Sequence, residues 1–208
     1  MNQDPMTSES KRVDTLLRYD PRSFPPFADV FGNDHPVEIE IGCGKGKFLI
    51  ARAMQYPDVN FLGIDLVWKW MRYAVERSQK RSLTNVKFIK TDAREMVRYG
   101  AQSATVSVFH IYFPDPWPKR RHHKRRLITG AFLRELHERL APGGLIELAT
   151  DHIDYFRQMQ AAVVHSGISW SRITERLNNR LFEAEAETNY ELKYSAAGRT
   201  LHYLELCK

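Results

Sequence analysis

The sequence predicts an α/β fold with a mostly parallel sheet and helices on both of its faces. Short apolar runs alternate with stretches whose apolar residues recur every three or four positions, which is typical of alternating strands and helices. A glycine-rich turn follows the first apolar run, Val37–Ile41, as at the ligand-binding edge of such sheets. The chain has 208 residues, a length that suits one substantial domain.

The elements follow in order along the chain. The apolar runs predict strands over Val37–Ile41, Asn60–Ile64, Val86–Ile89, Thr105–Ile111, Leu145–Ala149 and Thr200–Leu206. Helical spacing predicts helices over Phe48–Met54, Val67–Ala74, Phe132–Leu140 and Ile153–Val163. After Trp170 the pattern weakens, and a polar loop is predicted around Glu183–Asn189.

Residues 1–36 are predicted to form an N-terminal arm, and residues 37–208 to form the domain. The arm contains one short amphipathic segment, Val13–Tyr19, and the prolines that follow it, Pro21, Pro25, Pro26 and Pro36, prevent a long helix. The two cysteines, Cys43 and Cys207, have neither a disulfide-framework nor a zinc-site spacing. This spacing gives no reason to expect a metal site. We find no signal peptide and no long apolar run, so we expect a cytoplasmic protein that does not bind a membrane.

The positive charge of the chain is concentrated in one short run. Lysine and arginine number 31 against 25 acids, a net charge of +6, and Lys119–Arg126 alone holds six basic residues and no acid. Because the rest of the chain is balanced, this run predicts a local phosphate-binding patch. A solvated charged face without a ligand is the alternative.

A glycine turn follows the first predicted strand. Gly42, Gly44 and Gly46 give the pattern G-x-G-x-G, and Glu40 precedes it. Glycines let the backbone turn sharply and approach a ligand closely. A dinucleotide site has G-x-G-x-x-G instead, whereas an acid followed by G-x-G-x-G is typical of S-adenosylmethionine (SAM) sites. SAM carries a sulfonium and an ammonium group, and the carboxylate of Glu40 suits these charges.

Two more acids follow the next strands. Asp65 and Asp92 are expected at the same sheet edge, where ligands of open α/β sheets bind. We expect Asp65 to accept hydrogen bonds from the ribose hydroxyls and Asp92 to lie near the adenine. A helix N-cap is the alternative for each acid taken alone. Cys43 is not expected to act as a nucleophile, because no histidine stands near it in the sequence.

A proline-framed aspartate, Asp115, lies in the segment Phe113–Lys119 after the fourth strand. Phe113, Asp115 and Trp117 each precede a proline, which favours extended backbone. Regular alternation would place the Asp115 carboxylate between two aromatic rings, while a polyproline twist would spread the three side chains. A rigid linker is the alternative. The basic run follows directly, and the residues expected to contact phosphates are Arg120, Arg121, Lys124, Arg125 and Arg126.

In combination these motifs, with Ala149-Thr150-Asp151 and Thr188–Glu191, resemble the bacterial tRNA (guanine-N7-)-methyltransferases of the TrmB type. The likeness runs from about Val37 to the C-terminus. It implies a Rossmann-like class I methyltransferase fold with seven strands, and methyl transfer from SAM to N7 of a guanosine in the tRNA variable loop. We expect tRNA as the partner, and a monomer or homodimer without an obligate partner subunit.

The resemblance also implies site residues. SAM-binding positions are Glu40, Gly42, Gly44, Gly46, Asp65, Asp92 and Asp115, and substrate-binding positions are Lys119, Asp151, Thr188, Asn189, Tyr190 and Glu191. Two positions depart from the family pattern: Asp65 stands where many members have Glu, and Asn189 stands where a basic residue is frequent.

Asp115 is the expected catalytic residue. Guanine N7 carries an in-plane lone pair, so the reaction needs alignment and charge stabilisation rather than a general base. Two other functions stay open at this point. One is methylation of an exocyclic amine, because Asp115-Pro116-Trp117 is distantly similar to the D-P-P-aromatic motif of amino-methyltransferases. The other is RNA binding without catalysis on the same fold.

Overall fold

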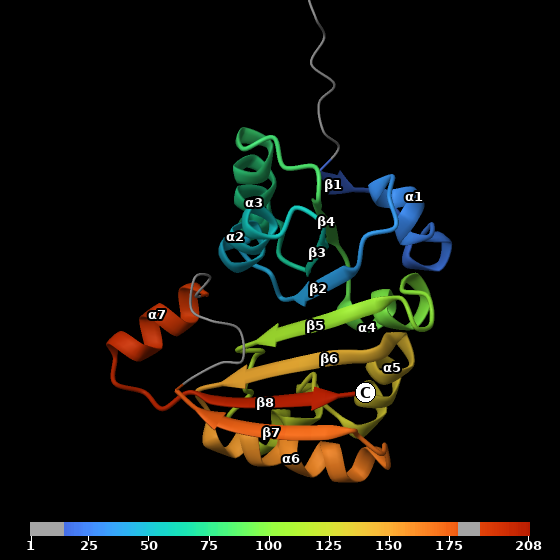
Figure 1. Cartoon of the computed structure of the whole chain (residues 1–208). Helices are drawn as coiled ribbons and strands as arrows, with labels where there is room; N and C mark the ends of the chain where they lie inside the picture. Colours follow the sequence, from blue (N-terminus) through green and yellow to red (C-terminus); the bar gives the residue numbers. More distant parts are fainter. Residues whose placement is uncertain (1–14, 179–187) are drawn as a thin grey trace, which may run out of the picture.

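The computed structural model describes residues 15–178 and 188–208, which form a single sheet with helices on both faces (Figure 1). The strand order is β1-β4-β3-β2-β5-β6-β8-β7. The strands are β1 (Leu16–Leu17), β2 (Val37–Ile41), β3 (Asn60–Asp65), β4 (Val86–Lys90), β5 (Val106–Tyr112), β6 (Leu140–Thr150), β7 (Arg172–Leu177) and β8 (His202–Cys207).

The predicted α/β class is confirmed, and the expected number of seven strands is wrong. Strands β1 to β6 run parallel, and β8 lies antiparallel between β6 and β7. The eighth strand comes from the predicted arm, where Leu16 and Leu17 pair with Phe88 and Ile89 of β4. Burial of Leu17 and a hydrogen bond from the Phe88 N–H to the Thr15 carbonyl attach this segment to β4.

Strand β7 was not among the predicted elements. Its side chains are exposed or half-buried, and Ile173 and Leu177 both face solvent. An edge strand of this kind has no apolar face to mark it in the sequence, and its position depends on pairing with β8.

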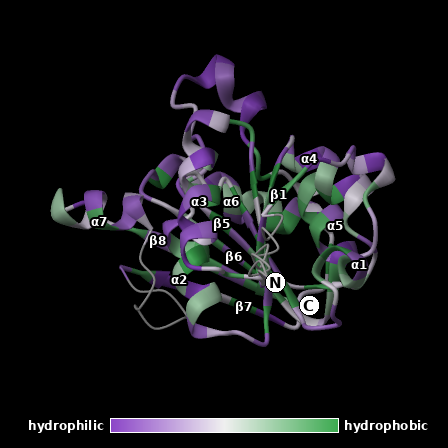
Figure 2. Cartoon of the chain, turned by 90° about the horizontal axis from the view of Figure 1, so that it is seen from above, coloured by the Kyte–Doolittle hydropathy of each residue, from purple (hydrophilic) through white to green (hydrophobic). Residues whose placement is uncertain are grey.

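Helices cover both faces of the sheet. They are α1 (Phe27–Phe31), α2 (Lys47–Gln55), α3 (Trp68–Lys80), α4 (Ala93–Glu95), α5 (Gly130–Arg139), α6 (Ile153–Ser166) and α7 (Asn189–Ala196). Figure 2 shows hydrophobic and hydrophilic residues alternating along these helices, as expected for helices with one buried side.

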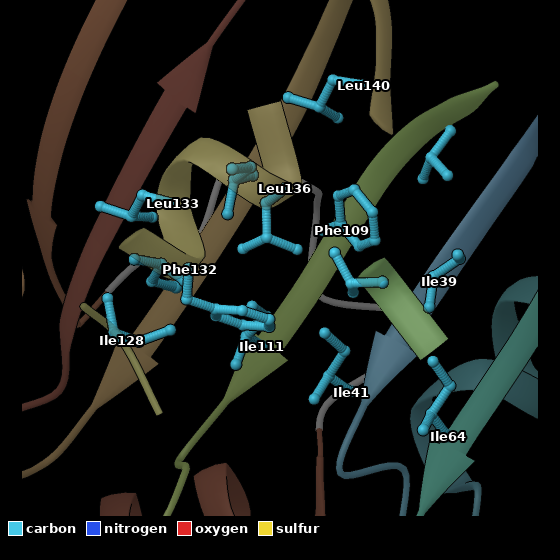
Figure 3. Close-up of a cluster of buried hydrophobic side chains, with 14 of the residues drawn as sticks. Ile39, Ile41, Ile64, Phe109, Ile111, Ile128, Phe132, Leu133, Leu136 and Leu140 are labelled. Atoms are coloured by element: carbon cyan, nitrogen blue, oxygen red, sulfur yellow. The ribbon is translucent and has the colours of Figure 1, made fainter. Parts of the chain in front are cut away.

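The larger core lies between the sheet and the pair α5 and α6. Phe132 and Leu136 of α5 lie on the side of the helix that faces Phe109 and Ile111 of β5 (Figure 3), and Leu133 belongs to the same buried cluster. A second core packs α2 and α3 against the opposite face of β3 and β4. These two cores hold the parallel strands in register, so that their carboxyl ends share one edge of the sheet.

Candidate active site

The glycine turn closes the carboxyl end of β2. Gly42, Gly44 and Gly46 have φ of 82°, 52° and 65°, the left-handed region that favours glycine. The Gly44 N–H donates to Asp65 Oδ2 at 2.8 Å, which ties the turn to the end of β3. Gly46 is the N-cap of α2, so the helix starts directly at the turn.

Gly46→Ala is expected to distort this turn. A Cβ at Gly46 would lie 2.6 Å from the Ala74 Cβ of α3, in addition to the left-handed backbone. We expect Gly46→Ala to abolish measurable SAM binding and to destabilise the protein by more than the roughly 1–2 kcal/mol that left-handed strain costs. Gly143→Ala is the matched control, because Gly143 has φ of 73° and open space around it. Calorimetry and thermal unfolding measure both effects, and normal SAM binding by Gly46→Ala would contradict the prediction.

The three predicted acids reach this edge from neighbouring strands. Glu40 is a buried residue of β2, and Asp65 also accepts a hydrogen bond from the Val67 N–H at 2.7 Å. Asp92 caps α4 by accepting from the Arg94 N–H at 2.7 Å, so the capping alternative describes its contact in this structure. Burial and the carboxylates of Glu40 and Asp65 raise the pKa of the Cys43 thiol, which disfavours a nucleophilic thiolate.

The proline-framed loop does not have the regular extended backbone that the sequence predicts. Phe113 and Trp117 have φ of 51° and 43°, so the prediction is wrong at both residues. Phe113 packs its ring 5.6 Å from that of Tyr194 in α7, and Trp117 lies edge-on to His122, 5.8 Å away. These ring contacts override the pre-proline preference for extended backbone. Asp115 between them is exposed.

The basic run forms the 3₁₀ helix Arg120–Arg125. Five of its cationic side chains are exposed: Lys119, Arg120, Arg121, Lys124 and Arg125. The Arg125 guanidinium lies 4.9 Å from the centre of the Trp117 ring, so the run and the proline-framed loop form one surface.

Arg126 does not have the exposed position that a phosphate contact would need, so the prediction that it binds phosphate is not supported by this structure. Its side chain is only 1% exposed, because the guanidinium points inward. It donates to the Pro116 carbonyl at 2.7 Å, to Gln158 Oε1 at 2.6 Å and to Asp154 Oδ2 at 2.5 Å. Arg126 therefore fastens the loop to α6 and has no donor directed at a phosphate.

Segment Thr188–Glu191 lies beside the proline-framed loop, as Phe113 is near both Tyr190 and Tyr194. Thr188 and Glu191 form a capping box at the start of α7, and the Glu191 carboxylate also accepts from the Tyr203 hydroxyl at 2.7 Å. Glu191 is buried, so the prediction that it contacts substrate is not supported by this structure. Its neighbours Asn189 and Tyr190 are exposed.

Asp151 follows β6 and is held by Arg199. The Arg199 guanidinium lies 2.5 Å from Asp151 Oδ2 and also 4.7 Å from the centre of the Tyr194 ring. Arg199 was not among the predicted site residues. No motif surrounds it in the sequence, and only the fold brings it to Asp151.

Comparisons with known proteins show the family of the chain. A family model described as "Putative methyltransferase" matches residues 34–204. The tRNA (guanine-N(7)-)-methyltransferase of Rubrobacter xylanophilus is 36% identical over 180 residues, covering 86% of this chain and 80% of its own. That of Streptococcus uberis is 33% identical over 177 residues, covering 85% and 83%. The chain belongs to the tRNA (guanine-N(7)-)-methyltransferase family. The resemblance stated from the motifs is thereby confirmed.

Solved structures support the fold of this family member. The "Structure of an Antibiotic Related Methyltransferase" has a TM-score of 0.63 at 20% identity and covers 95% of this chain and 98% of its own. The 16S rRNA methyltransferase KamB has a TM-score of 0.63 at 16% identity, covering 89% and 94%. None of the helices in residues 15–178 and 188–208 has the length and apolar character of a membrane span. Within the same residues, no group of three or more His, Cys, Asp or Glu side chains is arranged to hold a metal.

Behind the site, this methyltransferase contains a buried charge network, which we define as Glu38, Arg52, His110, Tyr112 and Glu147. Arg52 binds Glu38 with two hydrogen bonds of 2.9 and 2.8 Å. His110 Nε2 lies 2.9 Å from Glu38 Oε2, and its Nδ1 lies 2.9 Å from the Tyr112 hydroxyl, which donates to Glu147. The register places His110 opposite both Glu40 and Glu147, so the network connects β2, which leads to the glycine turn, with β5, which leads to Asp115.

The network shifts the protonation of its members. Burial alone would raise the pKa of Glu38, but hydrogen bonds and the charges of His110 and Arg52 outweigh it and lower the pKa to about 2. Burial alone would lower the pKa of His110, but the carboxylates of Glu147 and Glu38 outweigh it and raise the pKa above 6.5. Sequence reasoning missed the network, although the alternation of Glu38 and Glu40 within β2 placed both on one face.

Proposed function

We propose that this chain methylates N7 of a guanosine in the variable loop of tRNA, with SAM as the methyl donor. The observation that carries this proposal is the continuity of three features at one sheet edge: the glycine turn with its acids, the exposed Asp115, and the basic 3₁₀ helix. A methyl donor site beside a phosphate-binding surface suits a nucleic acid substrate.

The residues at the glycine turn fit SAM. The space around the Cα atoms of Gly42 and Gly44 is open, and the donors and acceptors at the edge are backbone N–H groups and the carboxylates of Glu40 and Asp65. When bound, SAM supplies a methyl group activated by a sulfonium charge. Glu40 would hold the cationic amino acid part of SAM, Asp65 its ribose and Asp92 its adenine. Gly42 and Gly44 would leave room for the ligand, and Gly46 would start α2 directly behind the turn.

Asp115 would orient the reactants. The attacking N7 has a free lone pair, so no side chain needs to remove a proton. The exposed carboxylate of Asp115 can accept from the guanine N–H groups or an ammonium group, and it would stabilise the positive charge that moves onto the purine. Asp151, Asn189 and Tyr190 lie at or near α7 and would contact the guanosine or its neighbours.

The exposed cations of the basic run would bind tRNA phosphates. We expect the triple variant Arg120→Ala, Arg121→Ala, Lys124→Ala to weaken tRNA binding and to lower the log–log salt slope by roughly 2 to 3, since each phosphate contact contributes about 0.7 to 0.9. Arg126→Ala is the contrasting variant: its contacts are internal, so it removes no phosphate contact and is expected to lower stability. Binding titrations at several salt concentrations measure the slope, and an unchanged slope for the triple variant would exclude these phosphate contacts.

The test of the function is incubation of total unmodified tRNA with labelled SAM, followed by nucleoside analysis and cleavage mapping of the methylated base. 7-Methylguanosine in the variable loop is the expected product. An N-methylated exocyclic amine would instead identify the first alternative. Binding of tRNA without SAM binding or methyl transfer would identify a non-catalytic RNA-binding protein.

A further inference from the structure

Exposed aromatic and basic side chains at the start of α3 form a surface that was not assigned a role in the site described above. Leu66, Val67, Trp68 and Trp70 are all exposed, with 40% of Trp70 open to solvent. Cations surround the rings: Lys45 Nζ lies 4.9 Å from the centre of the Trp70 ring, and Lys69 Nζ lies 5.0 Å from it. We call Lys45, Lys69, Trp70, Arg72 and Tyr73 the α3 surface.

The α3 surface lies at the same sheet edge as the SAM site. Helix α3 begins three residues after Asp65, and the Asp65 carboxylate binds the loop between them. Lys45 belongs to the glycine turn, and Arg77 of α3 donates to its carbonyl at 3.3 Å. The basic run follows β5, on the other side of the glycine turn in the strand order, so the two cationic surfaces flank the site.

The charges of the α3 surface favour an anionic ligand. Helix α3 contains four basic residues and one acid, Glu76. Among the described residues, no carboxylate forms an ion pair with Lys45, Lys69 or Arg72. Arg72 lies 4.7 Å from the centre of the Tyr73 ring, so the exposed Trp70 ring and the half-buried Tyr73 ring each have a cation beside them. Exposed rings interleaved with cations are the composition of surfaces that bind unpaired nucleotides.

We propose that the α3 surface is a second RNA-binding surface, on which unpaired bases of the tRNA stack on Trp70 and Tyr73 while Lys69 and Arg72 bind the flanking phosphates. An exposed ammonium–ring contact is weaker than stacking of a base on an indole, so an incoming base displaces the lysine, which then reaches a phosphate. The proposal rests on the proposed function, since it concerns the same substrate. It adds a contact on the side of the site opposite to the basic run.

The test compares Trp70→Ala, Trp70→Phe and Arg72→Ala for tRNA affinity across several salt concentrations. Base stacking on an aromatic side chain predicts that Trp70→Ala raises the Kd for tRNA about 5- to 100-fold with an unchanged salt slope. Trp70→Phe retains a ring and keeps most of the affinity. Arg72→Ala lowers the slope by about 0.7 to 0.9, as loss of one phosphate contact requires.

Tyr99→Ala is the matched control. Tyr99 is also exposed and flanked by cations, with the Arg22 guanidinium 5.3 Å from its ring centre, but it precedes β5 at the opposite edge of the sheet. We expect this variant to bind tRNA like the wild type. SAM binding by calorimetry and thermal unfolding show whether each variant keeps the fold and the neighbouring site.

The outcomes separate this inference from the proposed function. If the wild type forms 7-methylguanosine and Trp70→Ala and Arg72→Ala both bind tRNA normally, the inference is overturned and the function stands. Self-association of the wild type that Trp70→Ala abolishes, with tRNA affinity unchanged, would identify a second copy of the chain as the ligand and would also overturn it. A wild type that binds no tRNA would overturn both.

Discussion

Asp115→Ala is expected to lower the rate of methyl transfer at saturating SAM and tRNA by about 100-fold or more while the protein stays folded. Loss of alignment and of charge stabilisation at a reacting centre typically costs a factor of this size. Asp115 is exposed, and no described residue forms a hydrogen bond or ion pair with it, so its removal leaves the fold intact. Single-turnover transfer of labelled methyl to one tRNA measures the effect.

Two further variants separate the effect of charge from that of shape and control for the loss of an exposed acid. Asp115→Asn keeps the shape and removes the charge, so a comparison with Asp115→Ala separates charge stabilisation from positioning. Asp58→Ala removes an equally exposed acid in the loop between α2 and β3, at the opposite edge of the sheet, and is expected to leave transfer unchanged. Near-normal transfer by Asp115→Ala would remove Asp115 from the mechanism.

Glu38→Gln is expected to give the largest loss of stability. The substitution leaves the Arg52 guanidinium and His110 buried without the carboxylate that binds both. Removing one partner of a buried ion pair costs about 3–5 kcal/mol in the free energy of unfolding. Denaturant unfolding at pH 7 measures this loss. Glu135→Gln, which breaks a surface pair with Arg98, is the control and should lose much less.

The pH dependence of stability follows from the same network. The pKa of Glu38 is lowered to about 2, so its contribution is complete above its ordinary pKa of 4.5 and is lost as the pH falls from 4.5 toward 2. The pKa of His110 is raised, so its contribution is complete below 6.5 and is lost as the pH rises through the folded value. The destabilisation caused by Glu38→Gln should therefore shrink on acidification below pH 4.5. A difference that stays constant down to pH 2.5 would contradict the assigned protonation.

Features that depend on local sequence were the ones that could be predicted. The glycine turn needs left-handed backbone at three positions, and a G-x-G-x-G pattern shows this directly. Most residues of β2, β3 and β5 are buried because both faces of the sheet are covered, so the apolar residues of these strands form short runs that are visible in the sequence. By contrast, β1 has only two residues and is a strand because it pairs with β4. No local pattern in the sequence predicts this pairing.

The site was less predictable where a residue's role depends on what packs against it. Arg125 and Arg126 are identical neighbours in the sequence, but one stacks on Trp117 at the surface while the other is buried against α6. Glu191 belongs to a motif of the family and was predicted to bind substrate, but in the structure its carboxylate caps the start of α7. Phe113 has left-handed backbone because its ring packs against Tyr194, a contact between segments about 80 residues apart.

The inward contacts of Arg126 also bear on how fast the protein and a tRNA meet. They fasten the end of the 3₁₀ helix to Pro116 and α6, so the cations at its surface are displayed in one direction before any encounter. A fixed, one-sided positive field speeds diffusional association, and dissolved salt weakens that effect steeply. Arg126→Ala would loosen this support, so its association rate constant with tRNA should fall at low ionic strength and approach the wild-type value at high ionic strength.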